Sequence, residues 1–399
     1  MTTNFENLMT EATHAERHAD DEALIALDRG RALQLPATKR LRWFFLHPIL
    51  HRELDRVRHD VLELMEDNND VSIVSVIGLS GVGKTTASRL IRENLFEIFS
   101  AQIKEGHLPV LYVEAPANGE KRMSWSVLYQ RILHAGGAFA VPSMRAARIV
   151  EGRLVRSFGR ASIPELREFI ETMVQQRGVR VLIIDEALHL LRNENLDVLM
   201  DTLKSLSDIG GLKLLFIGSY DIAKVMTQYG QIARRAEIVH FQPYDLPDVD
   251  DSKQEQQPPQ SPRDGESSSD AYEFYVALQK NLMLWPCPVV PDLLRIWWQL
   301  MEVCLGSVGL LKMLLLRLAA LQMSSTSGLP TTGMLRKAGK SKKALEKLSS
   351  DLAGGREDLR FACYGESKLM DDYNELIRSV MAPIPQPPAT APQPESFHA

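Results

Sequence analysis

Short apolar runs alternate with longer amphipathic stretches between residues 71 and 244. The runs are dominated by β-branched and other apolar residues, whereas the stretches between them carry apolar residues at helical spacing. Such alternation is typical of a parallel sheet with helices on both faces, so the predicted fold class is α/β. The predicted strands are 71–77, 109–114, 180–184, 212–218 and a shorter one at 237–241.

The pattern changes on both sides of this region and suggests the domain boundaries. Residues 1–40 are polar and charged and are interpreted as an N-terminal extension before an α/β core at 41–244. Residues 245–270 are rich in Asp, Gln, Pro and Ser, and they predict a flexible insert because they bury too little apolar surface to order themselves. The further units are a helical region at 271–350, a helical segment at 351–381 and a disordered Pro-rich tail at 382–399.

Composition narrows the class of protein. The chain has 399 residues, 45% of them hydrophobic and 24% charged, with a net charge of −5, so a nucleic-acid site has to be a local feature. The cysteines Cys287, Cys304 and Cys363 have no metal-ligand spacing and fit a reducing cytoplasm. Neither a signal peptide nor a run of about 18 apolar residues is present, so we expect no membrane association.

Residues 78–85 read Gly-Leu-Ser-Gly-Val-Gly-Lys-Thr, directly after the first predicted strand and at the start of a helix-like stretch. This is the setting of a phosphate-binding loop, in which glycines let successive N–H groups point at phosphate oxygens. Lys84 is expected to reach the β- and γ-phosphates and Thr85 to hold Mg²⁺. An ordinary Gly-rich turn is the alternative. The predicted ATP-binding residues are Gly78, Ser80, Gly81, Val82, Gly83, Lys84, Thr85 and Thr86.

A carboxylate pair follows the third predicted strand. Val181 to Ile184 form a continuous apolar run that ends in Asp185 and Glu186. The carboxyl end of a parallel strand faces the ligand crevice, so Asp185 is the expected Mg²⁺-side carboxylate. Glu186 is then the candidate that polarises the attacking water, which predicts hydrolysis rather than binding alone. A surface acidic pair that caps the next helix is the alternative.

Three further positions complete a candidate ATPase site. Ser219 ends the fourth predicted strand and is a candidate to orient water or the γ-phosphate, although a simple strand-end turn has the same pattern. Arg234 and Arg235 precede the fifth strand, where an arginine reaches the γ-phosphate of a neighbouring subunit in ring-forming ATPases; a solvated pair is the alternative. Lys312 is placed to present its charge to the same nucleotide from the helical region. The aromatic stretch 42–48 is expected either to cover the base or to pack on the core.

Together these motifs resemble an AAA+ ATPase, a three-layer α/β fold with a helical lid. More narrowly, the chain resembles the TnsC/TniB family of transposition-regulating ATPases over roughly residues 40–350. One departure from the AAA+ pattern is Lys312, a point charge where AAA+ lids usually carry an arginine. The stretches that carry the resemblance are Ile184-Asp185-Glu186-Ala187-Leu188-His189-Leu190, Ile217-Gly218-Ser219-Tyr220, Gln231-Ile232-Ala233-Arg234-Arg235 and Gly306-Ser307-Val308-Gly309-Leu310-Leu311-Lys312.

The resemblance implies an ATPase that uses ATP and Mg²⁺ to assemble as a homo-oligomeric ring or helical filament on duplex DNA. Members of that family mark a target site and hand it to a transposase, so a transposase and a target-selector protein are the implied partners. Hydrolysis is expected to drive disassembly. A helicase loader or initiator of the same superfamily is one alternative, and a nucleotide-switched protein scaffold that does not bind DNA is another.

A local basic region supports DNA contact independently of the resemblance. Between residues 121 and 160 the chain carries eight basic residues against a single acid, Glu151. Such a stretch is a candidate phosphate-tracking surface with sequence-tolerant backbone contacts, and a solvated basic face is the alternative. Lys121 and Arg122 are the first candidates because they follow a strand where the family places its pore-facing loops. The other DNA-binding candidates are Arg145, Arg148, Arg153 and Arg156.

Overall fold

The computed structural model describes most of the chain. The described residues are 14–66, 70–100, 104–116, 124–137, 148–150, 153–155, 161–192, 196–223, 235–246, 258–263 and 267–364.

The core is a five-stranded sheet with every strand parallel, in the order β2-β5-β6-β1-β7. Each strand begins and ends within two residues of its predicted range. The α/β fold class is therefore confirmed. The strands are β1 (Ile73–Gly78), β2 (Val110–Glu114), β5 (Val181–Asp185), β6 (Lys213–Gly218) and β7 (Ala236–Phe241).

Helices cover the sheet, and all residues of β1 and β5 are buried. Such burial on both faces explains why these strands are continuous apolar runs rather than alternating ones. Helix α4 (Arg52–Leu64) packs against β1, β7 and α5 (Lys84–Ser100). The other core helices are α6 (Trp125–Ala135), α7 (Ile163–Arg177), the 3₁₀ segment η2 (Ala187–Arg192) and α8 (Leu196–Ser207).

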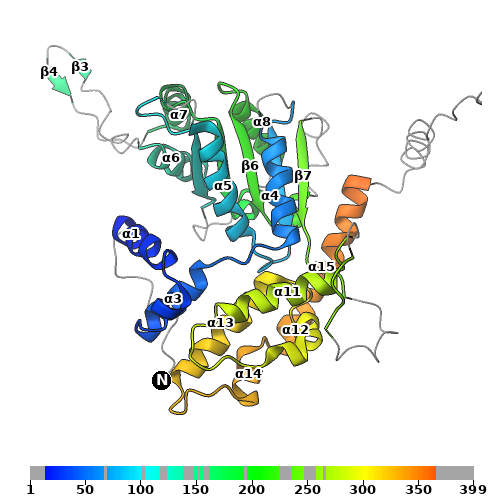
Figure 1. Ribbon diagram of the computed structural model, residues 1–399. Coiled ribbons are helices and arrows are strands. Elements are labelled where there is room, and N and C mark those ends of the chain that lie inside the picture. The colour runs from blue at the N-terminus through cyan, green and yellow to red at the C-terminus, as the bar shows by residue number, and fades with distance from the viewer. Residues whose placement is uncertain are drawn as a thin grey trace, which may run out of the picture.

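A helical lid follows the core and lies below the sheet in Figure 1. Its central helix, α13 (Val308–Ser324), is apolar on most of its surface because other helices surround it. Inside the lid, the indole N–H of Trp285 donates a 3.0 Å hydrogen bond to the Gln322 side chain. The other lid elements are α11 (Asp270–Met283), η4 (Leu293–Ile296), α12 (Trp297–Val303), α14 (Thr332–Ala338) and α15 (Lys342–Tyr364).

The N-terminal helices α1 (His14–Ile25), α2 (Arg29–Ala32) and α3 (Ala37–Leu46) join this lid. Helix α3 packs on α13, and its Phe44 ring lies edge-on to Trp285 with 5.9 Å between centroids. The Arg29 guanidinium donates hydrogen bonds to two carbonyls of the 285–287 loop. Because residues 1–40 are polar and charged, the sequence predicted an N-terminal extension there. In the structure, residues 29–46 pack against the helices of the lid.

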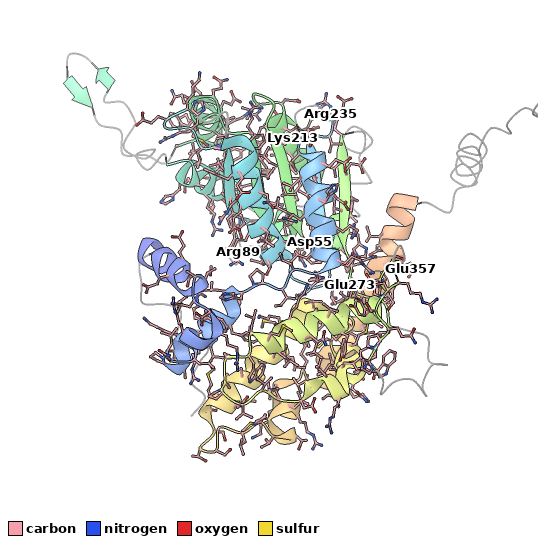
Figure 2. The ribbon with its side chains drawn as sticks, viewed as in Figure 1. Asp55, Arg89, Lys213, Arg235, Glu273 and Glu357 are labelled. Carbon is pink, nitrogen blue, oxygen red and sulfur yellow. The ribbon has the colours of Figure 1, made fainter. Side chains whose placement is uncertain are left out.

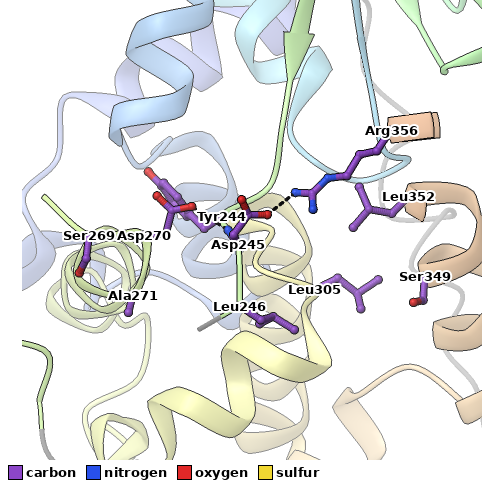
Figure 3. A pocket seen from close by; sticks show the side chains of 10 residues that line it. All are labelled: Tyr244, Asp245, Leu246, Ser269, Asp270, Ala271, Leu305, Ser349, Leu352 and Arg356. Carbon is purple, nitrogen blue, oxygen red and sulfur yellow. Dashed lines mark hydrogen bonds and ion pairs between the residues drawn. The ribbon is translucent and has the colours of Figure 1, made fainter. Parts of the chain in front are cut away.

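The lid and the core also meet through α15. A cavity of about 670 Å³ lies between the end of β7, the start of α11 and this helix. In Figure 3 the Arg356 side chain of α15 reaches across to the Asp245 carboxylate, an ion pair of 2.6 Å. Next to Arg356 in the helix, Gly355 lies against the ring of Tyr220, which follows β6. The last helix therefore holds the lid against two strand ends.

A short antiparallel hairpin, β3 (Arg148–Val150) and β4 (Arg153–Val155), extends away from the sheet (Figure 1). The sequence pattern did not predict it. In the part of the chain that the structure describes, no helix is long and apolar enough to span a membrane. Residues 247–257 and 264–266 of the predicted insert at 245–270 lie outside the described residues, and the predicted tail at 382–399 falls wholly outside them.

Candidate nucleotide-binding site

The loop between β1 and α5 has the backbone shape of a phosphate cradle. Gly81 and Gly83 have φ angles of 85° and 119°, which L side chains rarely adopt. The Lys84 ammonium folds over the loop and donates 2.9 Å hydrogen bonds to the carbonyls of Gly78 and Leu79. Burial lowers the pKa of Lys84 to about 8, against the opposing effect of Glu186 and Asp185.

Three parts of the chain enclose a cavity of about 570 Å³ above this loop. The phosphate loop forms the floor, the segment after α3 forms one wall, and the start of lid helix α13 forms another. Gly309 of α13 packs so closely on the loop that a Cβ there would overlap the Gly81 carbonyl oxygen. The lining includes Phe45, His47, Ile49, His51, residues 80–86, Arg89, Arg92, Tyr112, Glu186, Phe241 and Lys312.

Positive charge dominates this cavity. Lys84, Arg89, Arg92 and Lys312 line it, whereas Glu186 is the single carboxylate among the described lining residues. His51 adds no charge at neutral pH, because burial lowers its pKa to about 4. A triphosphate would satisfy this excess of cations, and the glycine cradle supplies backbone donors for it. The residues present therefore fit a nucleotide.

The acidic pair lies at the carboxyl edge of the sheet, as parallel strands require. Asp185 is buried, and its carboxylate accepts a 2.9 Å hydrogen bond from the Tyr112 hydroxyl and a 2.8 Å hydrogen bond from the Glu186 N–H. Glu186 has a φ of 51°, an uncommon conformation for a residue with a side chain. Strain of this kind clusters at functional sites, and here it accompanies an exposed carboxylate that enters the cavity.

The donor set also fits Mg²⁺. In the described part of the chain, no group of three or more His, Cys, Asp or Glu residues is placed to hold a metal ion. Mg²⁺ usually takes one or two protein oxygens and completes its shell with phosphates and water, and the Thr85 hydroxyl and the Asp185 carboxylate are oxygen donors of that kind. Thr85 and Asp185 are the residues that would hold it.

Lys312 reaches the cavity from the lid, but its ammonium is engaged elsewhere. The Nζ atom lies 3.6 Å above the centre of the Phe44 ring and 3.1 Å from the Asn281 side-chain oxygen. Burial lowers the pKa of Lys312 to about 7. With a neutral amide and an aromatic face as its contacts, the charged form is poorly compensated.

Among the predicted catalytic residues that the structure describes, Glu186 lines the cavity, whereas Asp185, Ser219 and Arg235 do not. The Ser219 hydroxyl donates to the Asp221 carboxylate at 3.3 Å and does not line the cavity. Arg235 lies at the opposite edge of the sheet, where its carbonyl accepts from the N–H groups of Ser72 and Ile73. The five strand residues that follow Ile73 place it about 17 Å from the phosphate loop. Figure 2 shows Arg235 and Lys213 at one end of the sheet and the cavity residue Arg89 at the other.

The predicted DNA-binding residues lie mostly outside the described part of the chain. Lys121, Arg122, Arg145 and Arg156 fall outside it, as does Arg234. Arg148 and Arg153 belong to the β3–β4 hairpin, in which Arg148 pairs with Val155 and Val150 pairs with Arg153.

Several cavity residues carry little or no signal in the sequence. Tyr112 and Phe241 look like core residues of strands, because a half-buried aromatic side chain fits any sheet. The aromatic stretch 42–48 did carry a signal. Trp43 and Phe44 are buried in the core, whereas Phe45 is 49% exposed and lines the cavity.

Comparison with known proteins agrees with this geometry. Residues 68–226 match the AAA domain family. No curated protein matches the chain. The five-stranded parallel sheet and the helices that cover it have the AAA+ fold.

Similar solved structures include proteins of Aeropyrum pernix and Pyrococcus abyssi. The ORC2 protein of Aeropyrum pernix, in ADPNP–ADP complexes, is 13% identical over 82% of this chain and 84% of that chain, with a TM-score of 0.46. A Walker-type ATPase of Pyrococcus abyssi is 15% identical over 84% and 87%, with a TM-score of 0.42. The Aeropyrum pernix ORC1 protein in complex with DNA is 18% identical over 73% and 65%, with a TM-score of 0.47. Likenesses this distant carry no argument about function.

Proposed function

We propose that this protein is an ATPase that binds ATP and Mg²⁺ in the cavity between the phosphate loop and the lid. The observation that carries the proposal is the convergence of Lys84, Thr85 and Glu186 on one cavity with an excess of positive charge. Lys84 would exchange its two loop carbonyls for phosphate oxygens. Bound Mg²⁺ neutralises charge on the β- and γ-phosphates.

Glu186 is the proposed water-polarising residue, and Asp185 is the proposed Mg²⁺-side carboxylate. The Tyr112 hydroxyl and the Glu186 N–H hold both Asp185 oxygens in place, so this carboxylate is preorganised. Phe45, His47 and Ile49 form the wall on which we place the base, because they supply aromatic and apolar surface to the cavity.

Glu186→Gln tests the enzymatic assignment. The variant keeps the shape of the site but loses the base, so we expect hydrolysis to fall by roughly 10²–10⁴-fold while nucleotide affinity persists. Glu105→Gln, at an exposed loop position, is the matched control and should hydrolyse ATP normally. Unchanged turnover in Glu186→Gln contradicts the role of Glu186.

We further propose that the ATPase assembles on duplex DNA and regulates transposition, with hydrolysis driving disassembly. The basis is the TnsC/TniB resemblance together with the basic stretch at 121–160. Lys121 and Arg122 are the leading DNA contacts, followed by Arg145, Arg148, Arg153 and Arg156. A transposase and a target-selector protein are the proposed partners of the assembled form.

Electron microscopy with duplex DNA and a non-hydrolysable ATP analogue tests this assembly. We expect rings or helices around DNA only when the analogue is present. Lys121→Ala with Arg122→Ala should reduce the slope of log affinity against log salt by about 2, since each phosphate contact contributes close to one unit. Lys104→Ala is the exposed control. Nucleotide-dependent assembly that forms equally well without DNA would favour a protein scaffold instead.

A further inference from the structure

A third cavity lies inside the lid, between α12, α13, α14 and the start of α15. It measures about 370 Å³. We call it the lid pocket. Its wall is largely apolar, and it opens beside exposed Val303 and Met313. Apolar lining residues are Leu300, Val303, Leu314, Leu335 and Leu345.

Three cations converge on this apolar pocket. Arg317 comes from α13, Arg336 from α14 and Lys340 from the turn before α15. Among the described residues that line the pocket there is no carboxylate. Lys342 and Lys343 add charge in the first turn of α15, where the helix dipole disfavours cations. Lys342 forms only a weak pair with Glu346, at 3.9 Å and with side chains 92% and 63% exposed.

An apolar pocket with a basic rim suits an acidic segment that carries apolar anchors. Residues 369–377 read Leu-Met-Asp-Asp-Tyr-Asn-Glu-Leu-Ile, with three carboxylates and no basic residue. At helical spacing of 100° per residue, the apolar positions fall within an arc of about 120° and the acids lie outside it. This is the pattern of a helix that docks in a groove. The apolar positions are Leu369, Met370, Tyr373, Leu376 and Ile377.

We propose that the lid pocket binds residues 369–377 of a second copy of this chain. Asp371, Asp372 and Glu375 would meet the basic rim while the apolar side chains enter the pocket. Charge complementarity supports this choice over duplex DNA, because phosphates would leave the apolar wall of the pocket without a partner.

The reach of the chain argues for a second copy rather than the same one. Helix α15 places Tyr364, its last residue, about 28 Å from Leu345 at the pocket. Leu369 follows Tyr364 by five residues, which span at most about 18 Å even when fully extended. Leu369 of a chain therefore cannot reach Leu345 of its own lid pocket, so docking of the whole segment from Leu369 onward favours a second copy.

A contact between the tail of one copy and the lid of the next is heterologous, so repetition produces a ring or a filament. This inference goes beyond the proposed ATPase activity, and the docking needs neither ATP nor DNA. An experiment can therefore show that the docking is absent while the ATPase activity is present, or the reverse.

Fluorescence anisotropy of a labelled peptide with the sequence 366–381, titrated with the full-length protein, tests the docking. We expect saturable binding that weakens at least tenfold in the Arg336→Glu, Lys340→Glu variant. The control variant Arg31→Glu, Lys104→Glu makes the same charge change at exposed positions away from the pocket and should bind within twofold of the unaltered protein.

Charge reversal on both sides sharpens the test. A peptide with Asp371→Lys and Asp372→Lys should bind the Arg336→Glu, Lys340→Glu variant better than it binds the unaltered protein. Matching thermal melts would show that the variants fold. Three results overturn the proposal: no binding to the unaltered protein, equal weakening in the control variant, or loss of duplex DNA affinity in the pocket variant with peptide binding intact.

Discussion

At the residue scale, Lys312 is unusual because its ammonium is buried, which disfavours the charged form, and because it lines the nucleotide cavity. Its ammonium has only a neutral amide oxygen and an aromatic face as contacts, and burial lowers its pKa to about 7. An arginine at this position would stay charged throughout the physiological range, whereas this lysine titrates within it. A nearby phosphate would restore the charged form.

We therefore predict that nucleotide binding takes up a proton at Lys312. Phosphate charge raises the pKa above its value of about 7 in the free protein. At pH 8 the free side chain is mostly neutral, so the contribution approaches one proton, and affinity falls as the pH rises above 7. Calorimetry in two buffers of different ionisation enthalpy measures the uptake.

Lys312→Met is the comparison, because Lys84 is also partly neutral at this pH and takes up protons in both proteins. The difference between the two proteins isolates Lys312. If the unaltered protein and Lys312→Met took up the same number of protons on nucleotide binding, the phosphates would not change the pKa of Lys312, and the prediction would be wrong.

The sequence predicted individual site residues where their chemistry is tied to a local pattern. Gly81, Gly83 and Lys84 are such residues, since the loop that needs them is contiguous. Tyr112 was missed, because its contact with Asp185 joins two neighbouring strands and leaves no spacing to recognise. Ser219 was predicted as a site residue only because it follows the end of a strand. Its hydroxyl instead donates a hydrogen bond to Asp221, and the strand pattern does not predict that direction.

At the scale of elements, strand positions were the most predictable feature. β1, β5 and β6 are buried throughout or nearly so, and such strands must be continuous apolar runs. The β3–β4 hairpin was missed because its two strands are only three residues long each. Arg29 and Phe44 belong to the lid through partners about 250 residues away, which no local pattern reports.

Helix α15 contains two adjacent glycines that have opposite surroundings. A Cβ on Gly355 would overlap the Tyr220 ring, whereas a Cβ on Gly354 meets nothing within 4 Å. Glycine costs a helix about 1 kcal/mol relative to alanine, so Gly355 is explained by the close approach of α15 to the end of β6.

We predict that Gly354→Ala stabilises the protein by up to about 1 kcal/mol and that Gly355→Ala destabilises it. In Gly355→Ala, α15 must shift away from Tyr220, which also strains the Arg356–Asp245 pair shown in Figure 3. Chemical denaturation of the two variants measures both effects. Because the substitutions are identical and adjacent in one helix, equal stability changes would contradict the packing of Gly355 on Tyr220.

At the scale of the whole molecule, the parallel sheet separates the two halves of the proposed catalytic machinery. Lys84 and Glu186 lie at the carboxyl edge, whereas Arg235 lies at the amino edge about 17 Å away. Arg235 therefore cannot serve the cavity of its own chain. Its 3.0 Å pair with Asp208 is 40% and 55% exposed and worth little, so a phosphate on a neighbouring subunit can replace it.

Mixing two inactive variants tests whether the site is shared between subunits. Glu186→Gln keeps an intact arginine but lacks the base, and Arg235→Ala keeps the base but lacks the arginine. In an equal mixture, about a quarter of head-to-tail interfaces combine the intact half of each, so ATPase activity should return to roughly that fraction of the unaltered level.

Arg234 is the second candidate, and the same mixture with Arg234→Ala identifies which arginine acts. A mixture that stays inactive with both arginine variants would contradict a site completed by the neighbouring subunit, whereas ATP hydrolysis by the isolated Glu186→Gln protein would contradict the role of the base.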